Sequence, residues 1–156
     1  MKTLLSFASK GLVVGIVLLA LAIPVSASRP EEVVFTFDLV ITVPDAAAEG
    51  TFVATGAIED IGTVDETFRW TDEGILQGTM LLTGAEGTIT LRFHLALLPI
   101  IGPPPAIPTT GSFVVVSGTG AYENIHGVGT AESMVYVTED PVAIDATFSG
   151  KVHVDP

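Results

Sequence analysis

Three polar side chains stand on otherwise apolar faces of predicted strands, where they could do chemistry on a bound molecule. Glu66 alternates with Val64 and Phe68, so the three side chains leave the strand on the same side. Glu132 and Tyr136 share one face of a later strand in the same way. A carboxyl or phenol beside a substrate can stabilise charge or move a proton there. Glu66, Glu132 and Tyr136 are therefore the candidate catalytic residues.

Glu66 stands closest to aromatic residues. If its face lines the interior of the fold, desolvation raises its pKa, and the carboxyl becomes a proton donor or a ligand anchor. A bulge in the strand, or a place at an open end of the fold, would instead leave Glu66 in water.

Other catalytic and metal-binding patterns are missing. The sequence contains no Gly-x-Ser-x-Gly, no His-Glu-x-x-His, no phosphate loop and no helix-flanked calcium loop. The histidines, His94, His126 and His153, are scattered along the chain, and alternation places Arg92 and His94 on the outer side of their strand. No metal site and no cofactor are therefore predicted.

Strands must position these residues, because apolar and polar side chains alternate and no segment after the N-terminus has a helical period. Short polar connections at 59–62, 71–74 and 84–87 end in glycine and predict hairpins. The fold class is thus all-β, a single eight-stranded antiparallel β-barrel, with a two-sheet β-sandwich as the alternative. The eight predicted strands are residues 33–43, 51–58, 62–70, 74–84, 87–98, 112–119, 127–138 and 143–154.

One connection differs from the hairpins. Residues 98–111 contain five prolines and no charged side chain, which predicts a stiff, extended loop. Such a loop could cover a ligand cavity or contact another subunit, or it could be a rigid spacer packed on the barrel.

The glycine-rich stretch "FVVVSGTGAYENIHGVGTAE", residues 113–132, resembles the family of allene oxide cyclases and plant dirigent proteins. The resemblance is carried by a strand at 114–116, Gly118-Thr119-Gly120, Tyr122, a short helical turn at 123–126, and Gly127 with Gly129. It implies an eight-stranded antiparallel barrel, often trimeric, with an apolar cavity. The plant enzymes cyclise an unstable epoxide, and the dirigent members steer radical coupling. The glycines fit a barrel corner, over which the Tyr122 ring can fold.

The N-terminus is typical of a secretory signal peptide. Lys2 and Lys10 precede an uncharged apolar run from Gly11 to Val25, which small residues follow at a cut after Ala27. An uncleaved anchor is the rival interpretation, but the run is shorter than the roughly 18 to 20 residues that a spanning helix needs. We expect a signal peptide at 1–27, a β-barrel domain at 28–156, and a secreted or periplasmic protein without a stable membrane anchor.

Charge and cysteine content narrow the partners and the source of stability. The formal net charge is −12, and all 18 acidic residues follow the predicted cut. Such a surface repels polyanions, which excludes nucleic acid as a partner. The chain has no cysteine, so the fold rests on core burial without disulfides.

Three functions remain open for this barrel. It could bind a small apolar molecule among Phe35, Phe37, Phe68, Trp70 and Phe148. It could be an isomerase or cyclase that uses the three candidate catalytic residues. It could also be filled solid by side chains, with a structural or interaction role and no ligand. A cavity open to solvent would separate the first two from the third.

Assembly is predicted from two segments that are apolar on both faces, residues 94–101 and 113–116. A lone barrel buries only its inner face, so these segments or the proline-rich loop are expected to form a homo-oligomer interface. The resemblance implies a trimer.

Overall fold

The computed structural model describes residues 29–44, 46–100 and 105–155, which form an all-β domain with one short 3-10 helix. The predicted signal peptide and its cut before Ser28 lie outside the described residues. The elements are β1 (Glu31–Val43), β2 (Ala47–Gly56), β3 (Asp60–Trp70), β4 (Ile75–Gly84), β5 (Thr88–Leu97), β6 (Ile107–Gly118), η1 (Gly120–Tyr122), β7 (Ile125–Tyr136) and β8 (Ala143–Val154).

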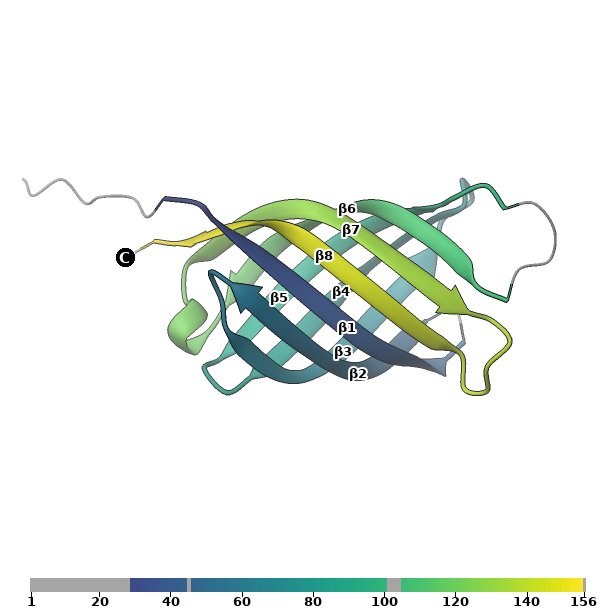
Figure 1. Ribbon diagram of the computed structural model, residues 1–156, viewed down its shortest axis with the longest axis horizontal. Coiled ribbons are helices and arrows are strands. Elements are labelled where there is room, and N and C mark those ends of the chain that lie inside the picture. Colours follow the sequence, from purple (N-terminus) through teal and green to yellow (C-terminus); the bar gives the residue numbers. More distant parts are fainter. Residues whose placement is uncertain (1–28, 45, 101–104, 156) are drawn as a thin grey trace, which may run out of the picture.

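The strands close into a barrel in chain order (Figure 1). Each strand pairs antiparallel with the next, and β8 pairs antiparallel with β1 through partners such as Phe35 and Phe148. The predicted eight-stranded antiparallel barrel is confirmed, and the two-sheet alternative is wrong. No helix in the described ranges is long and apolar enough to cross a membrane.

The two ends of the barrel differ. One end, at the left of Figure 1, carries η1, the start of β1 and the end of β8. The other end carries the β1–β2, β3–β4 and β7–β8 connections, and we call it the mouth. β3 runs toward the mouth, so Trp70 lies nearest to it, and Phe68 and Glu66 lie successively deeper.

Strand alternation builds the interior. On β1 every second residue from Val33 to Leu39 is buried, and the residues between them are exposed. Phe35, Phe37, Phe113 and Phe148 meet in the middle with ring centroids 5.0 to 6.3 Å apart, in edge-on and stacked pairs. Such aromatic contacts stabilise a core beyond the area that they bury. The central part of the barrel is therefore filled by side chains.

The glycines of the 113–132 stretch serve the barrel wall, as the sequence predicted. Gly120 begins η1 with φ +66°, a left-handed conformation that side chains disfavour. Gly129 permits close approach of strands, because a Cβ there would lie 2.3 Å from the Ser149 carbonyl oxygen and 2.5 Å from the Phe113 ring. The Phe113 ring occupies the space that a side chain at position 129 would need.

Three boundaries predicted from the sequence were wrong. β2 begins at Ala47 and not at residue 51, and β6 begins at Ile107, inside the segment predicted as a loop. Pro108 is accommodated because its carbonyl accepts a hydrogen bond from the Leu98 N–H at 3.0 Å, and proline lacks only the donor. The helical turn falls on η1 and not on residues 123–126.

The outer surface keeps the apolar residues on which the predicted assembly depends. Leu97, Leu98, Ile100 and Val116 are each between 40% and 47% exposed. The homo-oligomer interface, and the trimer in particular, stay predictions.

Candidate functional site

An apolar cavity of about 490 Å³ opens at the mouth of the barrel. Its walls come from the ends of β1, β3 and β7, the starts of β4, β6 and β8, and the β7–β8 connection. Among the described residues that line it, the side chains with a polar group are those of Thr42, Trp70 and Asp140. The residues that line it are Ile41, Thr42, Pro44, Phe68, Trp70, Leu76, Ile107, Val135, Val137, Asp140, Pro141, Val142 and Ile144.

The five aromatic residues predicted to hold a ligand divide between two places. Phe68 and Trp70 line the mouth cavity. Phe35, Phe37 and Phe148 are at most 1% exposed and belong to the filled core. The structure therefore places the cavity nearer to the barrel end than the sequence predicted, with the aromatic core as the layers beneath it.

Glu66 lies in the interior, on the predicted apolar face of β3. Its side chain is buried, with 4% of the residue exposed, and its Oε2 has no hydrogen-bond partner among the described residues. Its cross-strand neighbours are Ala48 on β2 and Met80 on β4, which offer no polar group. Burial raises the pKa of Glu66 to about 7, because the charged form loses its hydration without compensation.

Glu132 and Tyr136 lie on the outer face of β7. Glu132 is exposed, in a shallow groove of about 390 Å³ that it shares with Asp145. The Tyr136 hydroxyl donates a hydrogen bond to Asp145 Oδ2 at 3.0 Å, and this bond raises the pKa of Tyr136. The barrel wall separates both residues from Glu66, so the three candidate catalytic residues do not form one site.

A polar cluster at the η1 end was missed by the sequence reasoning. Asp60 is 8% exposed and accepts a hydrogen bond from the Tyr122 hydroxyl at 2.7 Å. Three backbone N–H groups also donate to it, those of Ile61, Ala85 and Glu86. Burial alone would raise the pKa of Asp60, but these four bonds outweigh it and hold the pKa below its ordinary 3.8. Asp60 had been assigned to a hairpin turn, which hid its role.

This cluster closes the η1 end of the barrel, since the Tyr122 ring folds over it as the glycine pattern predicted. We expect Tyr122→Phe to lower the free energy of unfolding by about 1.5 to 3 kcal/mol, the range for a hydrogen bond to a charged group. Urea denaturation at neutral pH measures the change. Tyr136→Phe is the matched control: its bond to Asp145 is exposed, so no measurable loss is expected. Equal losses in the two variants would contradict a closing role for Tyr122.

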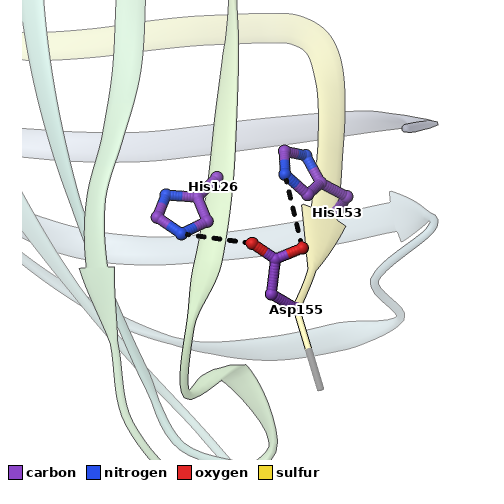
Figure 2. A network of polar contacts seen from close by, with 3 residues as sticks. All are labelled: His126, His153 and Asp155. Carbon is purple, nitrogen blue, oxygen red and sulfur yellow. Dashed lines mark ion pairs between the residues drawn. The ribbon is translucent and has the colours of Figure 1, made fainter. Parts of the chain in front are cut away.

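Two of the three histidines are neighbours in space, although the sequence suggested scattered positions. His126 on β7 lies directly opposite His153 on β8, and both point toward Asp155 (Figure 2). The His126 and His153 Nε2 atoms lie 3.7 and 3.8 Å from the Asp155 carboxylate oxygens. Within the described ranges, no group of three or more histidine, cysteine, aspartate or glutamate side chains is arranged to hold a metal ion. His94 and Arg92 are exposed on β5, as predicted.

The mouth cavity is therefore a concave apolar site within the described residues, and Glu66 lies two residues deeper along β3 than Phe68, which lines it. Its shape suits binding by burial of apolar surface. No family model, curated protein or solved structure matches the chain, so the resemblance to allene oxide cyclases and dirigent proteins stays a prediction from the sequence.

Proposed function

We propose that this protein is an exported barrel that binds a small apolar molecule in its mouth. The observation that carries the proposal is the cavity of about 490 Å³ and its apolar lining. Pockets for small molecules commonly measure roughly 300 to 1,000 Å³ and combine an apolar wall with few polar groups. The cavity fits this class in both size and chemistry.

The position of the cavity supports binding over the other two hypotheses. Side chains fill the centre of the barrel, so a ligand would bind at the mouth end. Binding at the mouth does not require an empty barrel centre. The cyclase hypothesis uses Glu66, Glu132 and Tyr136 against the bound substrate, and none of the three lines this cavity. Binding is therefore the function that the geometry supports best, and a cyclase activity has the weaker support.

Trp70 provides the test of binding. It is the only tryptophan of the chain, it lines the cavity, and it is 40% exposed. We expect N-phenyl-1-naphthylamine, a neutral apolar fluorophore, to quench Trp70 emission by energy transfer. The quenching should saturate with a Kd in the micromolar range, which corresponds to a binding free energy of about −8 kcal/mol. A neutral probe avoids repulsion by the acidic surface.

A pair of variants locates the site. Val137 lines the cavity and is 42% exposed, so Val137→Lys should preserve the fold but weaken the probe about tenfold. Val53 on β2 is 47% exposed and does not line the cavity, so Val53→Lys should bind as the wild type does. Equal affinity in all three proteins, or no saturable quenching, would overturn the proposed function.

A further inference from the structure

The buried side chains of the barrel include one polar group whose hydrogen bonding is incomplete. The buried polar residues are Asp60, Thr109 and Glu66. Asp60 accepts four hydrogen bonds, and the Thr109 hydroxyl bonds the Ser133 hydroxyl at 2.7 Å. Glu66 Oε2 alone has no partner among the described residues. A buried acceptor left unpaired is costly, so a donor on a bound molecule would stabilise it.

Glu66 adjoins the mouth cavity from below. Along β3 it is two residues deeper than Phe68, which lines the cavity, a step of roughly 6.6 Å. Across the sheet, the register places Ala48 between Glu66 and Ile41, another lining residue. Ala48 carries only a methyl group, which adds little bulk at this position. Glu66 is thus two residues from a cavity-lining residue along β3, and one strand position separates it from another across the sheet.

We propose that the ligand of the mouth cavity is an apolar molecule with a terminal hydroxyl group, which enters polar end first and donates a hydrogen bond to Glu66. This inference rests on the proposed function, because it assumes that the mouth cavity binds a molecule. Phe68 is only partly buried, and the proposal requires its ring to turn toward the mouth so that the hydroxyl end reaches Glu66.

The chemistry of the site favours a neutral donor. A carboxylate or phosphate ligand would meet both the Glu66 carboxylate and the acidic surface of the protein, and like charges repel. A hydrocarbon would leave the unpaired oxygen as it is. An alcohol supplies one O–H donor, which is the group that Oε2 lacks, and buries its chain against the apolar walls.

Two isomeric probes test the inference. 1-Octanol and 1-methoxyheptane have the same composition and nearly the same shape, but only the alcohol carries a hydrogen-bond donor. Their affinities are measured by Trp70 fluorescence at about pH 8, where Glu66 is ionised. We expect the wild type to bind 1-octanol at least about tenfold more tightly, because a hydrogen bond to a charged group contributes this much.

Two variants complete the experiment. Glu66→Met keeps the length of the side chain without an acceptor and should bind both probes with equal affinity. Glu66→Gln keeps an amide carbonyl and should retain part of the preference. Equal affinity of the wild type for the two probes, or a preference that persists in Glu66→Met, overturns the inference while the proposed function stands. If the wild type binds neither isomer and does not bind the naphthylamine, the inference and the proposed function are both overturned. If it binds the naphthylamine and neither isomer, only the inference is overturned.

Discussion

Gly129→Ala is expected to abolish the folded barrel or to lower its free energy of unfolding by more than about 3 kcal/mol. The new methyl carbon would lie 2.3 Å from the Ser149 carbonyl oxygen, 2.5 Å from the Phe113 ring and 2.6 Å from the Gly150 Cα. Two of these neighbours are backbone atoms of β8, and the third is part of the aromatic core. Relief would therefore require β7 and β8 to separate and the core to repack.

Urea denaturation followed by far-ultraviolet circular dichroism measures this loss. The control is Gly74→Asn in the β3–β4 turn, where φ is +74° and no atom lies within 4 Å of an added Cβ. Asparagine tolerates the left-handed region, so this variant should lose at most about 1 kcal/mol. Similar stabilities of Gly129→Ala and Gly74→Asn would show that the close approach of β7 and β8 does not require a glycine at position 129.

Glu66 is expected to make the protein less stable as the pH rises. Its pKa is about 7 in the folded state and 4.5 when solvated, so the folded state binds the proton more tightly. Stability from this group is fully present below about pH 4.5, declines as the pH rises to about 7, and then levels off once both states are ionised. At 1.36 kcal/mol for each pH unit, the loss above pH 7 is on the order of 3 kcal/mol.

Glu66→Met should remove this dependence and be the more stable protein at about pH 8, by a similar amount. Urea midpoints measured between about pH 5 and 8 give the comparison, with Glu132→Gln as a control, because Glu132 is exposed. Asp60 does not interfere: its lowered pKa makes stability fall only with acidification below its ordinary 3.8. A wild-type slope that persists in Glu66→Met would assign the effect to another group.

Strand alternation predicted which residues share a face, but it could not always tell whether that face points inward. Glu66 was placed correctly, because its face carries Val64 and Phe68 while Asp65 and Arg69 lie opposite. On β7 the face of Glu132 and Tyr136 contains Met134, whereas the inner face is built from small residues such as Ala131. The outer face therefore carries the larger side chains of the two, although it faces solvent.

The sequence could not predict how deep a residue lies within the barrel or which distant segments come into contact. Alternation gives Phe35 and Phe68 the same inward direction, yet only the stagger of the strands decides that one is core and the other lines the mouth. Asp60 and Tyr122 are 62 residues apart and meet because the barrel closes. The His126–His153 pair follows from the β7–β8 register, which hydrophobic patterning fixes only after the fold is known.

The pairing of β8 with β1 has a consequence for how the chain reaches its native state. Seven pairings join strands that follow each other, so they can form locally, whereas the eighth joins residues such as Glu31 and Val152 from opposite ends of the chain. Until that pairing forms, β1 and β8 both present rows of unpaired backbone donors and acceptors, which template intermolecular association. Pairing of the final strand thus acts as the closing step of folding. A nascent chain that lacks β8 is an open sheet, and its edge strands β1 and β7 can pair with other chains.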